Sequence, residues 1–270
     1  MFDRVAQSYT ITEQAITAIL NDEANPLYQV SKLIAAFDGQ AKVLDIGAGN
    51  GLLSMVVKRQ SANVIIDGIE PSAFAAEISF KWYRNFYQGY AQDFFDVIAR
   101  EHYDFIVLAD VIEHIEDPLS FIQALSQQIG STTKIIISVP NVAFGAVRAS
   151  LMRGEFQYVD SGILERTHLR FFTLATLTEF INKTGLNTVA TYFLCRNMLY
   201  SEIPFQFGIK NLFNFLMLNR DTLAHVYQFM VVLSKDTQEN STHLVKVGKC
   251  NEPSMMDVMR RFFFVNENLK

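Results

Sequence analysis

The sequence predicts a doubly wound α/β domain, in which helices cover both faces of a mostly parallel sheet. Strand-like and helix-like segments alternate from about residue 41 to residue 195, and such alternation is typical of α/β folds. The strand-like runs are apolar throughout, as expected for parallel strands that are covered on both faces. A chain of 270 residues, 50% apolar and 19% charged, is long enough for one sizeable domain with an extension, and its composition excludes a disordered or fibrous protein.

The first part of this domain alternates between strands and helices without long interruptions. Residues 42–47 form a short apolar strand that ends in glycine, and residues 52–60 after it have helical spacing. Residues 63–70 form a second strand, which ends in an acid. A helix follows from about Pro71 to Tyr87, because proline is tolerated in the first turn of a helix. Residues 94–100 are predicted to form a short helix.

The second part of the domain continues the pattern. Strands are predicted at 103–110, 134–140, 186–194 and 224–235, with a possible further strand at 242–248. Asp117 and Pro118 are an N-cap and a first helical position, so a helix begins there. Thr173 caps another helix, which ends at Gly185.

Several regions do not fit simple alternation, and they define the expected domain organisation. Residues 1–40 are predicted to form a helical segment before the sheet, and residues 41–235 form the main domain. Residues 141–172 and 196–224 are insertions in it, and residues 236–270 are a C-terminal extension. Long excursions in compact domains usually serve as lids or binding loops, so we expect the two insertions to act as lids.

Charge and hydropathy exclude some classes of partner. The net charge of −5 and the sequence pI of about 5.6 argue against a broad nucleic-acid-binding surface, which needs clustered Lys and Arg. The most apolar long stretch, residues 199–218, is interrupted by polar residues and is not expected to span a membrane. The N-terminus has no apolar signal core. We therefore expect a cytoplasmic protein that does not bind nucleic acid.

A glycine-rich turn joins the first strand to its helix. The turn is Asp45-Ile46-Gly47-Ala48-Gly49-Asn50-Gly51, and glycines allow a sharp turn and close approach of a ligand. The fingerprint for a dinucleotide places the third glycine at position 52, where this chain has Leu52. Asp45 would also repel a pyrophosphate, whereas it could pair with an ammonium group. A nicotinamide-dependent oxidoreductase is therefore disfavoured.

With these residues the chain resembles class I S-adenosylmethionine-dependent methyltransferases. Their first motif is the D-x-G-x-G-x-G turn, and the acid that ends their second strand is Glu70 here. The segment 108–122 resembles the ubiquinone-biosynthesis-like, small-molecule branch. The segment 138–173 resembles a subgroup found in polysaccharide and natural-product gene sets. The resemblance covers roughly residues 40–195 and does not extend beyond them.

The resemblance implies a Rossmann-like sheet of seven strands, mostly parallel, with one antiparallel strand near the C-terminal end. It also implies S-adenosyl-L-methionine as cofactor and S-adenosyl-L-homocysteine as its product. Glu70 is then expected to bind the ribose, and Gln92 and Asp93 to lie near the adenine, although Asp93 could instead be a plain helix N-cap. The expected cofactor-binding residues are Asp45, Gly47, Ala48, Gly49, Gly51, Glu70, Pro71, Gln92, Asp93, Asp110 and Val111.

Two histidines are candidate catalytic residues, because a hydroxyl acceptor must lose a proton and the pKa of histidine lies near neutral pH. His114 follows a strand at the edge where open α/β sheets bind ligands. His168 lies at the end of the first insertion. Each could instead have an ordering role through hydrogen bonds. Asp110, Glu113 and His114 could form part of a metal site, but nothing elsewhere completes one convincingly, so no metal is expected.

The first insertion is locally basic and carries the candidate substrate-binding residues Tyr158, Arg166 and Arg170. Arginine binds phosphate or carboxylate in a bidentate manner, so an acidic acceptor would fit. The alternative is that the arginines form salt bridges with neighbouring acids, and that Tyr158 packs the lid.

The function that these residues favour is methyl transfer to a small molecule in a biosynthetic pathway, for a sugar, polysaccharide or natural product, with oxygen as the expected acceptor atom. The alternative is a non-catalytic donor-binding or scaffold subunit of a biosynthetic complex. The Phe-rich segment 196–224 favours that alternative, because it could meet a second copy of the chain or a pathway partner. Its phenylalanines Phe205, Phe207, Phe213 and Phe215 could otherwise line a hydrophobic acceptor pocket.

Overall fold

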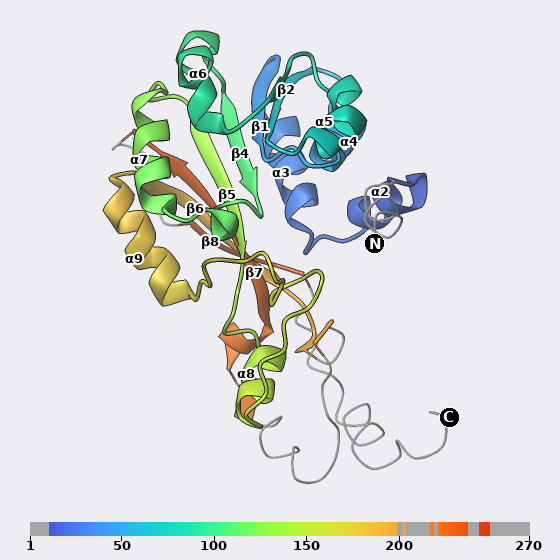
Figure 1. Ribbon diagram of the computed structural model, residues 1–270, viewed down its shortest axis with the longest axis vertical. Coiled ribbons are helices and arrows are strands. Elements are labelled where there is room, and N and C mark those ends of the chain that lie inside the picture. The colour runs from blue at the N-terminus through green and yellow to red at the C-terminus, as the bar shows by residue number, and fades with distance from the viewer. Residues whose placement is uncertain (1–10, 199–201, 204–216, 219–220, 237–242, 249–270) are drawn as a thin grey trace.

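The computed structural model describes residues 11–198, 202–203, 217–218, 221–236 and 243–248 (Figure 1). Its strands form one eight-stranded sheet in the order β3-β2-β1-β4-β5-β7-β6-β8. The strands are β1 Ala41–Ile46, β2 Val64–Glu70, β3 Phe86–Gln88, β4 Phe105–Ala109, β5 Lys134–Pro140, β6 Asn187–Cys195, β7 Val226–Ser234 and β8 His243–Val247. β7 runs antiparallel to β5 and to β6, and the other pairs are parallel. This confirms the predicted mixed sheet.

The main difference from the prediction is an eighth strand, β3. The helix expected up to Tyr87 ends much earlier, as α5 Ala73–Ser79 and a 3₁₀ turn at Phe80–Trp82. Residues Phe86–Gln88 then pair with β2, and Phe86 lies opposite Gly68. A Cβ atom on Gly68 would lie 2.9 Å from the Tyr83 ring and 3.1 Å from the Phe86 ring. The missing side chain thus lets both aromatic rings pack onto β2, and this tertiary packing overrides the helical pattern of the sequence.

Helices cover both faces of the sheet (Figure 1). α3 Pro26–Ala35 and α4 Leu52–Gln60 pack through Val30, Ile34, Leu53 and Val57 against one face. α6 Phe95–Glu101, α7 Pro118–Gln127 and α9 Leu174–Thr184 pack against the other face. α2 Glu13–Leu20 precedes α3 and contacts α4. The remaining short elements are the 3₁₀ turns η2 Ala91–Phe94, η3 Ile112–His114 and η5 Thr222–His225.

The predicted helix boundaries follow from hydrogen bonds of polar caps. The Asp117 carboxylate accepts a bond from the Ser120 amide at 3.1 Å, at the start of α7. Thr173 and Thr176 form a reciprocal capping box at the start of α9. α9 ends at Gly185, whose φ of 77° lies in the left-handed region that glycine adopts readily. The local polar pattern therefore fixes where these helices begin and end.

The first insertion forms a small core of its own. It contains α8 Gly145–Leu151, which lies below the body of the sheet in Figure 1. Buried apolar side chains from this segment pack against others from residues 198–224, and this satellite cluster contains Phe144, Ala146, Val147, Ala149, Ile163, Leu164, Met198, Ile203, Leu218 and Ala224. A bridge between Asn141 and Phe172 closes the base of the segment. The two insertions are therefore joined by apolar packing.

Some predictions concern residues beyond those that the structure describes. Phe205, Phe207, Phe213 and Phe215, and the helix expected near residues 253–264, lie outside the described residues. Among the helices that are described, none combines the length and the apolar character that a membrane-spanning segment needs.

Candidate active site

The glycine turn after β1 has the conformation that its sequence predicts. Gly47, Gly49 and Gly51 all have positive φ, at 76°, 50° and 86°. The amides of Gly47 and Ala48 donate to the carbonyl of Ile69 at 2.9 and 3.0 Å. A Cβ atom on Gly47 would lie 2.7 Å from a Val111 methyl carbon. Only glycine therefore allows this turn to pass so close to the loop after β4.

Glu70 is held rigidly beside the turn. Its two carboxylate oxygens accept hydrogen bonds from the amides of Gly49 and Ser72, each at 2.8 Å. The side chain is largely buried, because only 8% of the residue is exposed. Each carboxylate oxygen has a further lone pair, so Glu70 can accept additional bonds from hydroxyl groups of a ligand.

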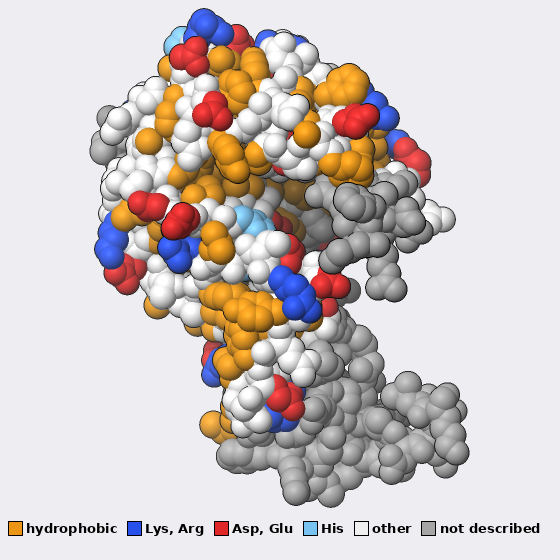
Figure 2. Space-filling model, in the orientation of Figure 1, with side chains coloured by type: hydrophobic (Ala, Val, Ile, Leu, Met, Phe, Trp, Pro, Cys, Tyr) orange, Lys and Arg blue, Asp and Glu red, His pale blue; other side chains and the backbone are white. Residues whose placement is uncertain are grey.

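A cavity of about 1000 Å³ opens next to Glu70. Figure 2 shows a hollow in this face of the molecule, with histidine atoms at its edge. Apolar side chains line one part of the cavity, among them Val111, Ile115 and Phe121. An apolar slot beside a fixed carboxylate suits a nucleoside, whose base is flat and whose sugar carries hydroxyls. Of the predicted cofactor-binding residues, the walls include Gly47, Gly49, Glu70, Pro71, Gln92, Asp110 and Val111.

A second, smaller cavity of about 360 Å³ lies on the other side of the glycine turn. Gly47, Gly49 and Asp110 line both cavities, so these adjoin. Asp45 and Ala48 line the smaller one. The structure thus brings nine of the eleven predicted cofactor-binding residues onto two neighbouring cavities at the carboxyl ends of β1, β2 and β4.

Gly51 and Asp93 lie on neither cavity wall. Gly51 is the N-cap of α4, and a Cβ atom there would lie 2.9 Å from the Trp82 ring. The Asp93 carboxylate accepts a bond from the Tyr90 amide at 3.1 Å and so caps η2. Both residues support the loops that form the cavity walls. Asp93 is the third residue of η2, and Phe94 is the N-cap of the helix that follows, so Asp93 does not cap that helix.

Asp45 is a buried acid with a single hydrogen-bond donor facing it among the described residues. It is 3% exposed, and the Tyr83 hydroxyl donates to its carboxylate at 2.7 Å. Burial raises the pKa of Asp45 to about 7, and the negative charge of Glu70 adds to this, while the bond from Tyr83 opposes it. A cation next to Asp45 would favour its ionised form.

Asp110 follows β4 in a backbone conformation that non-glycine residues rarely adopt, with φ of 55°. Its carboxylate accepts bonds from the Ser138 hydroxyl and the Gln228 side-chain amide. Burial raises the pKa of Asp110 to about 6, against these two bonds and the positive charge of Arg196. Strained residues of this kind are concentrated at functional sites, and Asp110 separates the two cavities.

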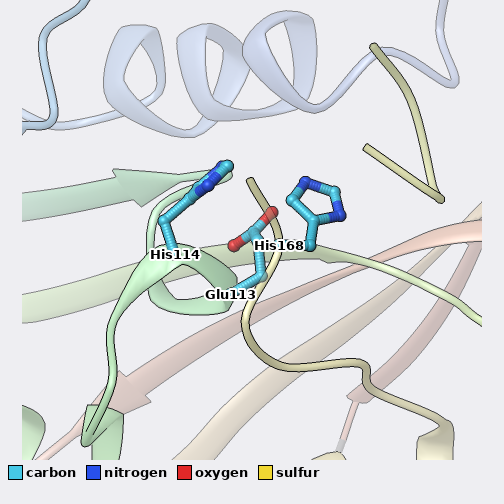
Figure 3. A group of neighbouring side chains, drawn as sticks. All are labelled: Glu113, His114 and His168. Carbon is cyan, nitrogen blue, oxygen red and sulfur yellow. The ribbon is translucent and has the colours of Figure 1, made fainter. Parts of the chain in front are cut away.

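The two predicted catalytic histidines meet at a buried acid, Glu113. Figure 3 shows the Glu113 carboxylate between the imidazoles of His114 and His168. The ring centroids are 4.8 Å apart. His114 and Glu113 come from η3 after β4, whereas His168 comes from the first insertion. The amides of Leu169 and Arg170 donate to the Glu113 carbonyl at 2.8 and 3.0 Å, and these two bonds hold the insertion against η3.

The hydrogen bonds of this cluster leave nitrogen atoms available. Nδ1 of His168 lies 3.0 Å from the Ile163 carbonyl, and Nδ1 of His114 lies 3.2 Å from the Thr167 carbonyl. A carbonyl only accepts, so each Nδ1 must carry the proton and each Nε2 keeps a lone pair. Burial lowers the pKa of His168, while its bond to Ile163 opposes this shift. The lowered pKa favours the neutral form of His168, which can accept a proton.

Glu113 is the unusual member of the cluster. It is 1% exposed, and neither carboxylate oxygen has a hydrogen-bond partner among the described residues. Burial, with the negative charge of Asp110, raises the pKa of Glu113 well above its ordinary value. A buried carboxyl without partners calls for a proton, a polar ligand atom or a cation.

The same three side chains could hold a metal ion, although the sequence led us to expect none. Their potential ligand atoms lie within 4.8 Å of one another. Two ligand atoms bound to one ion at about 2.1 Å can be at most about 4.2 Å apart. The three side chains would therefore have to move closer together to bind an ion. The cluster is thus open for an ion and already suited to proton exchange.

None of the predicted substrate-binding residues lines either cavity. Arg166 pairs with Asp160 at 3.1 Å, and its side chain is 64% exposed. Arg170 bonds to the carbonyls of Glu116 and Leu169. Tyr158 is exposed, and its ring packs against that of Phe156 at 5.4 Å. The pair of Arg166 with Asp160 is a salt bridge of the kind that the sequence left open, whereas Arg170 bonds to backbone carbonyls and not to an acid. Glu165 and Leu169 of the same segment line the larger cavity.

The sequence analysis missed residues that approach the site from distant elements. Gln228 is a buried polar residue in the apolar strand β7, and its amide bonds to Asp110. Tyr83 reaches Asp45 from the segment that was predicted to be helical. Arg196 follows β6 and lines the smaller cavity. A polar residue inside an otherwise apolar strand was the available signal for Gln228; the other two depend on the fold.

Comparison with known proteins agrees with this geometry. Residues 23–191 match the model of a family described as "Methyltransferase domain". The ubiquinone biosynthesis O-methyltransferase of Leptothrix cholodnii is 27% identical over 195 residues, which cover 67% of this chain and 80% of that protein. The protein of the same name from Shewanella sp. strain ANA-3 is 25% identical over 195 residues, with 67% and 78% covered.

Solved structures show the same fold at low sequence identity. A SAM-dependent methyltransferase from Archaeoglobus fulgidus is 15% identical with a TM-score of 0.56, and the match covers 77% of this chain and 92% of that chain. The plantazolicin methyltransferase BamL, in complex with a triazolic desmethylPZN analog and SAH, is 15% identical with a TM-score of 0.54. That match covers 87% of this chain and 91% of that chain.

Proposed function

This chain belongs to the methyltransferase-domain family and is a class I S-adenosylmethionine-dependent methyltransferase, and we propose that it methylates a hydroxyl oxygen of a small-molecule acceptor in a biosynthetic pathway. The Glu113–His114–His168 cluster, of which His114 lines the donor cavity, carries this proposal. An oxygen acceptor needs a base, and this cluster supplies one. The names of the relatives, which are O-methyltransferases of ubiquinone biosynthesis, support the same acceptor atom.

The donor fits the two adjoining cavities. Glu70 is positioned to accept bonds from the two ribose hydroxyls, and charge makes such bonds stronger than neutral ones. The apolar slot with Val111 and Phe121 suits the adenine. The amino-acid end would then cross the glycine turn, where Gly47 and Gly49 leave room, toward Asp45 and Asp110.

Methyl transfer is a displacement in which the acceptor must be aligned and deprotonated. Bound S-adenosylmethionine supplies a methyl group activated by its positively charged sulfur. In our proposal, His168 accepts the hydroxyl proton at Nε2, because Nδ1 is engaged with Ile163. His114 lines the donor cavity and orients the acceptor oxygen. Glu113 lies between them and, in its ionised form, would stabilise the imidazolium that forms at His168.

We expect replacement of His168 to abolish turnover without loss of donor affinity. His168→Asn is the informative variant, because its amide can still donate to the Ile163 carbonyl but cannot act as a base. General-base catalysis contributes about 10²–10⁴-fold, so the rate should fall by about that factor. The rate is measured as S-adenosylhomocysteine release with a panel of phenols and sugar alcohols. Affinity for S-adenosylhomocysteine, measured by calorimetry, should change by less than about threefold, a difference below 1 kcal/mol.

A matched control is His102→Asn, because His102 is exposed at the end of α6, with φ of 51°, a conformation that asparagine tolerates. Unchanged turnover in His168→Asn would remove His168 from the mechanism. The control variant should match the wild type in both assays.

Two further measurements separate the remaining alternatives. Turnover that disappears after chelation and returns with Mg²⁺ or Mn²⁺ would assign the cluster to a cation instead of a proton. Donor-product binding without methyl transfer to any acceptor of the panel would favour a non-catalytic donor-binding subunit.

A further inference from the structure

The wall of the larger cavity carries charge of one sign. The Asp and Glu side chains that line it are Glu70, Asp110, Glu116, Asp117 and Glu165. Within the described part of the chain, neither lysine nor arginine belongs to this wall. A cavity lined by negative charge attracts positively charged ligands and repels negatively charged ones.

Several of these acids have neighbours that compensate their charge. Glu70 accepts bonds from two backbone amides, each at 2.8 Å. The positive charge of Arg170 acts on the Asp117 carboxylate, and that of Arg196 acts on the Asp110 carboxylate. The negative charge of these three acids is therefore partly balanced within the protein.

Glu165 lacks such a counter-charge. Its carboxylate accepts a bond from the Thr167 hydroxyl, and none of the salt bridges between described residues includes it. The arginines that follow it in the sequence are directed elsewhere, since Arg166 pairs with Asp160 and Arg170 bonds to backbone carbonyls. The charge of Glu165 thus remains available to a ligand.

The backbone holds Glu165 beside the candidate base. A bridge joins Val159 to Glu165, and the His168 amide donates to the Glu165 carbonyl at 3.1 Å. The residue is half-buried and lines the larger cavity, as His114 does. Because Glu165 and His168 belong to one short turn, a molecule whose hydroxyl reaches His168 also lies close to Glu165.

Glu113 gives a second indication of a positively charged ligand. It is 1% exposed, and its carboxylate has no hydrogen-bond partner among the described residues. One of its oxygens lies within 4.8 Å of a ring nitrogen of His114 (Figure 3), which lines the cavity. The negative charges of Asp110 and Glu165 both act on Glu113. A cationic group of a ligand in this part of the cavity would offset the charge of all three acids.

We propose that the acceptor carries an ammonium group in addition to its hydroxyl, and that Glu165 binds this group. The inference rests on the proposed methyl transfer to a hydroxyl at the same cavity. A carboxylate or phosphate on the acceptor would meet like charges on the wall, which repel it. Glu165 therefore selects a cationic acceptor over the acidic one that the arginines of the first insertion led us to expect.

The test uses three phenols that differ in the charge at the end of a two-carbon chain. Tyramine ends in an ammonium group, tyrosol in a hydroxyl group and phloretate in a carboxylate. Calorimetry measures the affinity of each phenol for the protein saturated with S-adenosylhomocysteine. Since charged hydrogen bonds are stronger than neutral ones, tyramine should bind about tenfold more tightly than tyrosol, and phloretate should bind most weakly. High ionic strength should reduce these differences.

Variants of Glu165 isolate the effect of its charge. Glu165→Gln keeps the shape of the side chain, and the preference for tyramine over tyrosol should fall below about threefold. Glu165→Lys should bind phloretate more tightly than tyramine. Both variants should bind S-adenosylhomocysteine within about threefold of the wild type. Glu179→Gln is the matched control, because it removes an exposed acid of α9 that lines neither cavity; it should keep the wild-type order of affinities.

Three results would overturn the role of Glu165. They are no binding of tyramine at millimolar concentration, equal affinity of the wild type for the three phenols, and a preference for tyramine that persists in Glu165→Gln. These affinities are measured without turnover, so they do not depend on methyl transfer. Methylation of tyrosol without any preference for tyramine would keep the proposed function and refute the ammonium group. A preference for tyramine that depends on Glu165, without methylation of any phenol, would support Glu165 and count against the hydroxyl acceptor.

Discussion

At the scale of single residues, the site depends on acids that burial holds near their neutral form. Asp45 is the clearest example, since its pKa is raised to about 7 by burial. The folded protein therefore binds a proton at Asp45 more tightly than the unfolded chain does. This adds to the free energy of unfolding, and the contribution is complete at a pH below the ordinary pKa of an aspartate. This stability is lost as the pH rises through about 7.

Asp45 should release a proton when the donor product binds. The ammonium group of S-adenosylhomocysteine favours ionised Asp45, so at pH 7 about half a proton should leave per ligand bound. Calorimetry in phosphate and in Tris, which differ in ionisation enthalpy, measures this number. Asp45→Asn cannot ionise and should show a smaller release. Equal binding enthalpies in both buffers for the wild type would contradict the prediction.

At the scale of elements, β3 exists because Gly68 lacks a side chain. Tyr83 occupies the space beside Gly68, and its hydroxyl then reaches Asp45 at 2.7 Å. The pairing of β3 with β2 and the hydrogen bond from Tyr83 to Asp45 thus depend on the same packing of the Tyr83 ring against Gly68. This relation links sheet architecture to the chemistry of the smaller cavity.

We expect Gly68→Ala to destabilise the protein by about 1–3 kcal/mol, because the added methyl group would overlap the Tyr83 ring. The free energy of unfolding in urea measures this. Gly130→Ala is the matched control, since a Cβ atom there has nothing within 4 Å. The control should be neutral or slightly stabilising. Similar unfolding curves for the two variants would mean that β2 and β3 can separate without cost.

At the scale of the whole molecule, three apolar clusters support different parts of the site. The clusters on the two faces of the sheet support the donor site, and the satellite cluster supports the segment that carries His168. Leu164 is 2% exposed in the satellite cluster, whereas Leu125 is fully buried against the sheet. The two leucines therefore report on different parts of the protein.

Leu164→Ala should loosen the first insertion without unfolding the sheet. A buried Leu→Ala change costs about 2–5 kcal/mol, and here that cost should fall on the satellite cluster. Hydrogen exchange should become faster in residues 141–172, turnover should fall, and S-adenosylhomocysteine should bind nearly as in the wild type. Leu125→Ala should lower the global stability instead. Faster exchange throughout the sheet of Leu164→Ala would show that the clusters unfold as one.

The fold and the donor site followed from local sequence signals to different degrees. The strands around Asp45, Glu70 and Asp110 were predicted because apolar runs that end in glycine or acid are local patterns. β3 was missed, because its pairing depends on the contact between Gly68 and two distant aromatic rings. Arg196 was also missed, because its approach to Asp110 requires β6 and β7 to lie beside β5. Contacts between distant segments are the part that sequence patterns do not encode locally.

The two hydrogen bonds to the Glu113 carbonyl restrict how ligands can enter and leave. They fasten residues 169 and 170 to the turn after β4, so the end of the first insertion cannot swing outward while they persist. Rearrangement during a catalytic cycle is then confined to the middle of the segment, where Leu151, Met152, Phe156 and Tyr158 are exposed. The end of the segment, which carries His168, therefore keeps its position against η3 while the middle of the segment rearranges.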